Sequence, residues 1–162
     1  MEEQRLMVKA MQQDEVVNNK KKSAAYIKWE KYFDGKTEVD LFRMNLTDED
    51  ALAIGELLKT NNTLKWLRLD NNNITDVQSI GEALKTNNTL KKLHLWGNNI
   101  TDDSGIQSII DGLKTNNTLK YLDLRWNQLS SNMKSQLEAI EQYKKDGSNG
   151  YQQVKWMEIR IY

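Results

Sequence analysis

The sequence contains no cysteine and no proline, and His94 is its single histidine. Without cysteine the chain has no disulfide, no thiolate nucleophile and no cysteine-based zinc site, and one imidazole excludes any site that needs two. No apolar run approaches the roughly 18 residues that a membrane-spanning helix needs. The 23 basic side chains balance the 23 acidic ones, so no overall field attracts the chain to nucleic acid or to an anionic membrane.

The amino-terminal stretch MEEQRLMVKAMQQDE is charged throughout and lacks the apolar core of a secretory signal. We therefore expect a cytoplasmic protein. The chain of 162 residues has the length of about one domain. Hydrophobic residues make up 38% of it, and their strong periodicity argues against disorder.

An internal repeat is the strongest pattern in the sequence. The segment LKTNNTL occurs at residues 58–64, 84–90 and 113–119. Each copy leads into Leu-x-x-Leu-x-Leu-x-x-Asn-x-(Ile/Leu), whose asparagines are Asn72, Asn98 and Asn127. Leu-x-Leu puts two side chains on one face of a strand, and an asparagine can satisfy backbone groups in the turn that follows. The pattern predicts strand, turn and helix units that must stack to bury their apolar faces.

Two degenerate copies extend the array. In TEVDLFRMNL, Val39 and Leu41 occupy the leucine positions and Met44 replaces the asparagine, so we expect the asparagine ladder to begin one repeat later. At the other end, VKWMEIRIY is predicted as a fifth strand with Met157 and Ile159 in the leucine positions. The sequence thus predicts five parallel strands with four helices behind them.

The helix starts carry capping signals. Thr75 and Gln78 have the spacing of a capping box, in which a hydroxyl and a side chain three residues later satisfy backbone donors. Residues 1–33 do not fit the repeat, and their apolar residues predict one or two helices. Terminal repeats need a cap, and we expect residues 1–36 to form a helical N-terminal cap, with Trp29 in its core, and residues 37–162 to form the repeats.

The repeat resembles that of leucine-rich repeat proteins over residues 37–145. The spacings of 26 and 29 residues between copies resemble those of the cytosolic, ribonuclease-inhibitor-like class of these repeats. The sequence NNTLK bears a weaker likeness to tropomodulin repeats. The resemblance implies an α/β solenoid, a short horseshoe with a parallel sheet on its concave face and helices on its convex face. It also implies a binding protein, an enzyme inhibitor, a cytoskeletal regulator or a pathogen effector.

Residues between the leucines point away from the core, and we expect them to line the concave face. Large aromatics and arginines recur there, and these residue types dominate interface energetics. The candidate partner-binding residues are Phe42, Trp66, Arg68, Asp70, His94, Trp96, Tyr121, Asp123, Arg125 and Trp156. The structural alternative is that cross-strand pairs of these types stabilise the sheet by roughly 0.2–1 kcal/mol each.

The leading hypothesis is a non-enzymatic protein–protein interaction module with a protein partner, no cofactor, no metal, and no catalytic residue. A monomer is favoured. One alternative is an assembly protein that self-associates as a homodimer through an exposed edge strand at 154–162. Others are a tropomodulin-like, actin-regulating domain and an engineered scaffold without a ligand. The recurring Asn-x-Thr triplets are interpreted as products of the repeat and not as glycosylation acceptors.

Overall fold

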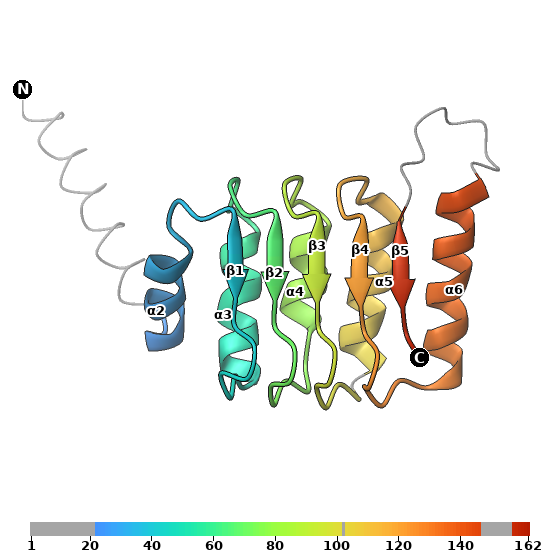
Figure 1. Cartoon of the computed structure of the whole chain (residues 1–162), viewed down its shortest axis with the longest axis horizontal. Coiled ribbons are helices and arrows are strands. Elements are labelled where there is room, and N and C mark those ends of the chain that lie inside the picture. The colour runs from blue at the N-terminus through green and yellow to red at the C-terminus, as the bar shows by residue number, and fades with distance from the viewer. Residues whose placement is uncertain (1–21, 102, 147–156) are drawn as a thin grey trace, which may run out of the picture.

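The computed structural model describes residues 22–101, 103–146 and 157–162. Helices and strands alternate in the order α2 (Ala24–Phe33), β1 (Glu38–Asp40), α3 (Asp48–Leu58), β2 (Trp66–Arg68), α4 (Gln78–Leu84), β3 (Lys92–His94), α5 (Asp103–Thr115), β4 (Tyr121–Asp123), α6 (Ser131–Asp146) and β5 (Glu158–Arg160). The strands form one parallel sheet in chain order. Figure 1 shows α3, α4 and α5 behind this sheet, with α2 beside its first strand and α6 beside its last. The predicted α/β solenoid of five strands is therefore confirmed.

The register of the first four strands follows the leucine pattern. Val39, Leu67, Leu93 and Leu122 lie opposite one another on β1 to β4, and each is at most 1% exposed. Because strand side chains alternate, the residues on either side of each of them face away from the helices. The buried side chains form one continuous cluster that extends from α2 to β5.

The fifth strand is out of the predicted register by two residues. β5 pairs Glu158 with Tyr121 and places Ile159, not Met157, opposite the buried leucine of β4. Met157, Ile159 and Ile161 are all buried. An apolar residue at every second position fits the leucine pattern in either register, so the pattern alone did not separate the two.

This shift changes the occupants of the sheet surface. Glu158 lies opposite Tyr121 on the neighbouring strand, and Arg160 lies opposite Asp123. The sequence pattern instead predicted Trp156 opposite Tyr121 and Glu158 opposite Asp123. Trp156 itself lies outside the described residues. The candidate site therefore ends in a charged pair, with Arg160 Nε donating to Glu158 Oε1 at 2.6 Å.

An asparagine ladder bonds successive repeats at the turn after each strand. The side-chain nitrogen of Asn72 donates to one carbonyl of its own repeat and one of the preceding repeat, at 2.9 Å each. Its oxygen accepts from two backbone N–H groups of the preceding repeat at 2.9 and 3.0 Å. Asn98 and Asn127 likewise each donate to a carbonyl of their own repeat and to one of the preceding repeat, and the oxygen of each accepts a backbone N–H group of the preceding repeat. The prediction that the ladder begins in the second repeat is confirmed.

A second asparagine ladder, which the sequence analysis missed, closes the opposite end of the strands. It is built from the first asparagine of each LKTNNTL copy, Asn61, Asn87 and Asn116. Asn87 donates to the carbonyls of Leu58 and Asn61 at 2.7 and 3.0 Å. In the following repeat, Asn116 donates to the carbonyls of Leu84 and Asn87 at 2.7 and 2.9 Å. Both side chains are buried, so these Asn-x-Thr triplets recur for a structural reason.

Helix α4 does not begin with the predicted capping box. It begins at Gln78, whose N–H donates to Asp76 Oδ1 at 2.7 Å. The Thr75 hydroxyl instead donates to Asp48 Oδ2 of the preceding helix at 2.6 Å. Thr75 lies two positions before Val77, the N-cap residue of this helix, and it serves as a further link between repeats.

Glycines let the helices approach closely. A Cβ built on Gly81 of α4 would lie 2.5 Å from backbone atoms of both Ser108 and Ile109 in α5. A Cβ on Gly112 would lie 2.7 Å from the Gly81 carbonyl oxygen. Since real Cβ atoms do not pack so closely, the spacing of α4 and α5 requires glycine at these positions.

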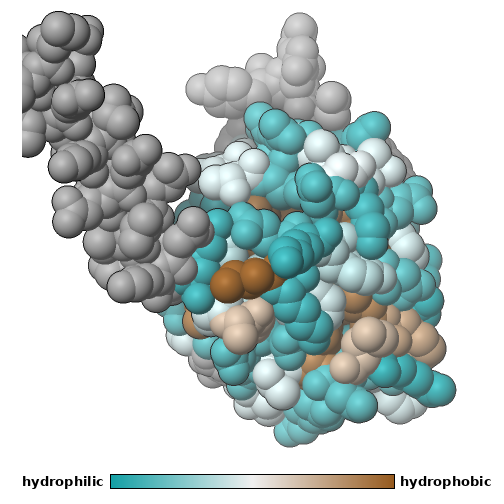
Figure 2. Space-filling model, turned by 90° about the vertical axis from the view of Figure 1, so that its left-hand side faces the viewer, coloured by the Kyte–Doolittle hydropathy of each residue, from teal (hydrophilic) through white to brown (hydrophobic). Residues whose placement is uncertain are grey.

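Helix α2 packs on the first repeat. Its Trp29 and Phe33 are each 1% exposed, and Trp29 Nε1 donates to Asp50 Oδ1 of α3 at 2.8 Å, so Trp29 is a core residue as predicted. Ile27 and Tyr32 are exposed on the outer side. Figure 2 shows this end of the molecule, mostly hydrophilic with a small hydrophobic area. Within the described ranges, no helix is long and apolar enough to cross a membrane.

Candidate functional site

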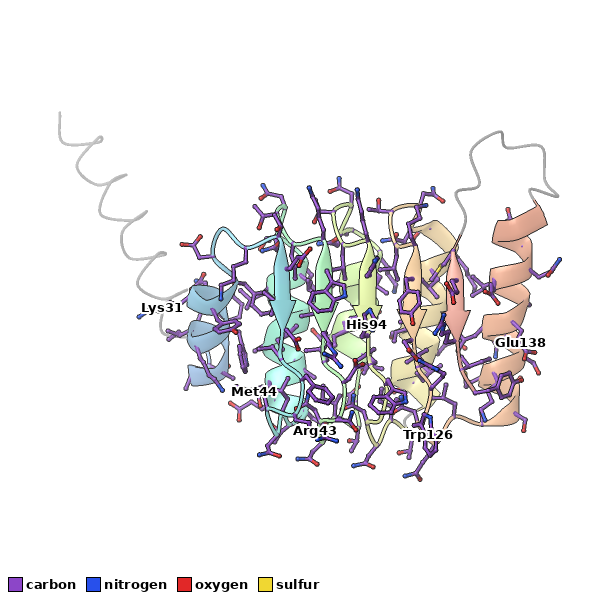
Figure 3. All side chains as sticks on the ribbon, viewed as in Figure 1. Lys31, Arg43, Met44, His94, Trp126 and Glu138 are labelled. Atoms are coloured by element: carbon purple, nitrogen blue, oxygen red, sulfur yellow. The ribbon has the colours of Figure 1, made fainter. Side chains whose placement is uncertain are left out.

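The face of the sheet turned away from α3, α4 and α5 carries the candidate site, and we call it the open sheet face. Its side chains, strand by strand, are Glu38, Asp40, Phe42, Trp66, Arg68, Asp70, Lys92, His94, Trp96, Tyr121, Asp123, Arg125, Glu158 and Arg160. Figure 3 shows His94 near the middle of this face. The strands thus bring nine of the ten candidate residues onto one surface.

Three rings from neighbouring strands form an aromatic row. Trp66 of β2 meets His94 of β3 edge to face, with ring centroids 5.8 Å apart and an interplanar angle of 78°. His94 lies 4.8 Å from the ring of Tyr121 on β4. All three side chains are half-buried. Such contacts contribute about 0.5–1.5 kcal/mol beyond area burial, so the row is a rigid and partly accessible feature of the open sheet face.

Arg68 is held in place at the first end of this row. Its Nε donates to Asp70 Oδ2 at 2.8 Å and its Nη1 to Asp40 Oδ2 at 3.3 Å. Its guanidinium lies 4.2 Å from the centroid of the Phe42 ring. Asp70 is only 4% exposed, and its other oxygen accepts the Trp96 backbone N–H at 2.9 Å. Asp70 therefore positions Arg68 and Trp96 and offers little surface of its own.

Asp123 organises the other end in a similar way. Arg125 binds it with Nε at 3.0 Å and Nη2 at 2.7 Å, and the Tyr121 hydroxyl donates to it at 3.1 Å. Burial raises the pKa of Asp123, but the hydrogen bonds from Arg125 outweigh burial and hold that pKa below its usual value. Burial, together with the charge of Asp123, raises the pKa of Tyr121. Asp123 stays ionised and positions the Arg125 and Tyr121 side chains.

No acid–base pair forms at the histidine. His94 Nδ1 lies 3.8 Å from Asp70 Oδ2, which is too long for a hydrogen bond. Burial lowers the pKa of His94, and the positive charges of Arg68 and Lys92 lower it further. The negative charges of Asp70 and Asp123 raise it, but they do not offset burial. Neutral imidazole is thus the form that the aromatic row accommodates. Over the described ranges, no group of three potential ligands could hold a metal ion.

The lowered pKa of His94 predicts a loss of stability on acidification. The unfolded chain takes up this proton near pH 6.5 while the folded chain does so only at lower pH, so the free energy of unfolding falls as pH drops below about 7. His94 is the only histidine and the chain has no cysteine, so no other side chain ordinarily titrates in this range. Melting temperatures measured from pH 7.5 to 5.5 should fall more steeply for the wild type than for His94→Gln. Equal slopes would contradict the prediction.

The amino-terminal ends of the strands carry a shallow groove beside Trp66. It has a volume of about 260 Å³ and is lined by Glu38, Lys65, Trp66, Lys91 and Lys92. Pockets for small molecules are usually about 300–1,000 Å³ and enclose most of the ligand. This groove suits single side chains of a larger partner better than a cofactor.

The last strand is not an open edge along its whole length. The N–H of Ile159 points away from β4 and donates to Glu141 Oε1 of α6 at 3.1 Å. A strand from a second molecule would have to displace this carboxylate before it could pair there. Arg160 and Glu158, which flank Ile159, also place charges on the edge, a known protection against pairing.

The sequence analysis missed one exposed aromatic at the carboxyl ends of the strands. Trp126 is 76% exposed and has a φ of 57°, a conformation that favours glycine. Asn71 and Gly97 occupy the same left-handed position in the preceding repeats. Figure 3 shows Trp126 at the lower edge of the open sheet face. The signal was available, because Trp126 directly precedes the ladder asparagine of its repeat.

Comparison with known families agrees with this geometry. Residues 86–107 and 115–132 match the family model described as leucine-rich repeat, and these segments contain β3, β4 and their turns. No curated protein matches the chain. The match supports a leucine-rich repeat protein in general, and neither the ribonuclease-inhibitor-like class nor the tropomodulin likeness receives separate support.

Proposed function

We propose that the protein is a non-enzymatic module. It binds a partner protein through the open sheet face of its leucine-rich repeat solenoid. Leucine-rich repeats generally mediate protein–protein interaction. The observation that carries the proposal is the aromatic row of Trp66, His94 and Tyr121, held beside Arg68 and Arg125 on the face of the sheet that no described helix covers.

The supporting argument is preorganisation. Arg68 and Arg125 are fixed by Asp70 and Asp123, and the rings are fixed by one another, so few side chains would lose freedom on binding. Immobilising a flexible side chain costs roughly 0.5–1.5 kcal/mol, and aromatic and arginine side chains are the residues that anchor interfaces. Trp66 and Trp96 are half-buried and lie outside the core cluster, which leaves part of each for a partner.

The proposal predicts that removing the two tryptophans abolishes binding without unfolding the chain. Each anchor in an interface contributes about 2 kcal/mol or more, so the loss of both in Trp66→Ala/Trp96→Ala should raise the dissociation constant on the order of a thousand-fold. Proteins retained from a lysate by the wild type would be identified, purified and titrated against both forms. Circular dichroism would establish that the variant is folded.

The matched control removes two large exposed side chains from the helices. Leu52 of α3 and Tyr143 of α6 are 56% and 44% exposed, and Leu52→Ala/Tyr143→Ala should bind the partner as tightly as the wild type. A partner that loses affinity only for the control variant would place the interface on the helices and refute the proposal.

No structural observation specifically favours self-association or an actin contact. Self-association through the last strand is opposed by the bond from Ile159 to Glu141. A tropomodulin-like contact with actin would require an effect on pointed-end growth, and nothing on the open sheet face favours actin over other proteins. We therefore keep a monomeric protein-binding module as the proposal.

A further inference from the structure

A column of lysines runs along the amino-terminal ends of three neighbouring strands. Lys65, Lys91 and Lys120 follow the last leucine of LKTNNTL in each copy. Their backbones are joined directly, because the Lys91 N–H donates to the Lys65 carbonyl and the Lys120 N–H to the Lys91 carbonyl, both at 2.8 Å. Neighbouring strands lie about 4.8 Å apart, so the three side chains start from adjacent points of one edge.

Lys65 and Lys91 differ from the other cations of the open sheet face, whereas Lys120 Nζ donates to the Asn117 carbonyl at 2.9 Å. Arg68, Arg125 and Arg160 each bind a carboxylate on the same face. Lys65 and Lys91 are exposed, and among the residues that the structure describes neither has a carboxylate within ion-pair distance. Like charges on adjacent strands repel each other. At Lys65 and Lys91 the described part of the chain therefore holds positive charge that none of its carboxylates pairs with.

The charge surrounds an apolar wall. Lys65, Lys91 and the exposed Lys92 line the shallow groove beside Trp66, with Glu38 as its one acidic lining residue. The groove therefore combines three cations with one face of an indole. This combination fits carboxylates that lie close to an apolar side chain in a partner.

We propose that this surface, the lysine edge (Lys65, Lys91 and Lys92), binds an acidic segment of the partner protein, with carboxylates on the lysines and an apolar side chain against Trp66. The inference rests on the proposed function and names the chemistry of the partner. An acidic peptide is favoured over nucleic acid for two reasons. The chain has no net charge, and the arginines that would grip phosphates in a bidentate manner are already bound to Asp70 and Asp123.

The test uses two triple variants that remove the same charge from opposite sides of the molecule. The first is Lys65→Gln/Lys91→Gln/Lys92→Gln on the lysine edge. The second is Lys59→Gln/Lys85→Gln/Lys114→Gln on the helices, where each lysine binds a carboxylate three residues before it. The probe is a short fluorescein-labelled peptide of glutamates with one phenylalanine, followed by fluorescence anisotropy at about 0.1 M salt, where charges more than about 10 Å apart are screened.

The wild type and the helix variant should bind this peptide equally, and the lysine-edge variant should bind it about tenfold more weakly. A peptide with glutamine in place of glutamate should not bind. Equal weakening by both variants would show a response to net charge alone and overturn the inference. So would an absence of peptide binding to the wild type, or tighter binding of single-stranded oligothymidylate than of the peptide.

The purified partner separates this inference from the proposed function. If Trp66→Ala/Trp96→Ala loses the partner and the lysine-edge variant keeps it, the inference fails and the proposed function stands. If neither variant loses the partner, both fail. If the tryptophan variant and the lysine-edge variant both lose the partner, while Lys59→Gln/Lys85→Gln/Lys114→Gln keeps it, the proposed function and the inference are both supported.

Discussion

Asn72→Ala should lower the free energy of unfolding by about 3 kcal/mol or more, one of the largest effects of a single substitution in this chain. The substitution leaves two carbonyls and two N–H groups without their partner in a position that is only 5% exposed. Each unsatisfied buried group costs roughly 1–3 kcal/mol. Thermal unfolding followed by circular dichroism should show a melting temperature lower by roughly 10 °C for a domain of this size.

The neighbouring surface asparagine provides the control. Asn99 lies next to the ladder residue of the following repeat and is exposed, so Asn99→Ala should change stability by no more than about 0.5 kcal/mol. Equal melting temperatures for Asn72→Ala and Asn99→Ala would mean that water replaces the ladder bonds at no cost, and the ladder would then not hold the repeats together.

Gly81→Ala should destabilise the protein by about 3 kcal/mol, although alanine is the better helix former. In an ordinary helix the same change stabilises by about 1 kcal/mol. Here the added Cβ would lie 2.5 Å from the backbone of Ser108 and of Ile109, and backbone cannot rotate aside as a side chain can. Separating α4 from α5 costs packing of the kind that overfilled cores lose. Urea denaturation should show a lower midpoint with an unchanged slope.

Gln78 of the same helix gives a matched comparison. Its side chain is exposed, so Gln78→Ala tests alanine in α4 without the close approach, and it should be neutral. A Gly81→Ala protein as stable as the wild type would show that α4 and α5 can move apart freely, and the close contact would then not fix the helix spacing.

The repeat made most of this fold predictable. Leu67, Leu93 and Leu122 indicated how three strands pair, because each follows a copy of LKTNNTL at the same distance. The same logic failed at β5, where buried residues alternate from Met157 to Ile161 and no ladder asparagine follows to mark the register. The triplets at Asn87 and Asn116 were attributed to the repeat, but their ladder was not predicted, because it depends on where the carbonyls of the preceding repeat lie.

The candidate site was predictable in its location and less so in its arrangement. Alternation placed Trp66, His94 and Tyr121 on one face, which the structure bears out. It did not indicate that Asp70 and Asp123 would be buried beneath the arginines, because a strand pattern distinguishes two faces and not depth within a face.

The two asparagine ladders have a consequence for how such a chain can change in length. Each ladder bond joins a repeat only to the repeat before it, so no bond spans more than one boundary. Duplicating the 26-residue unit that separates the first two LKTNNTL copies would therefore keep the native boundary on each side of the duplication and add one boundary, between the two copies, that carries the same ladder asparagines. The longer protein would gain one strand, about 4.8 Å of open sheet face and one more lysine along its edge. Copy number is thus a means by which evolution can lengthen this face without redesigning the interior of the protein.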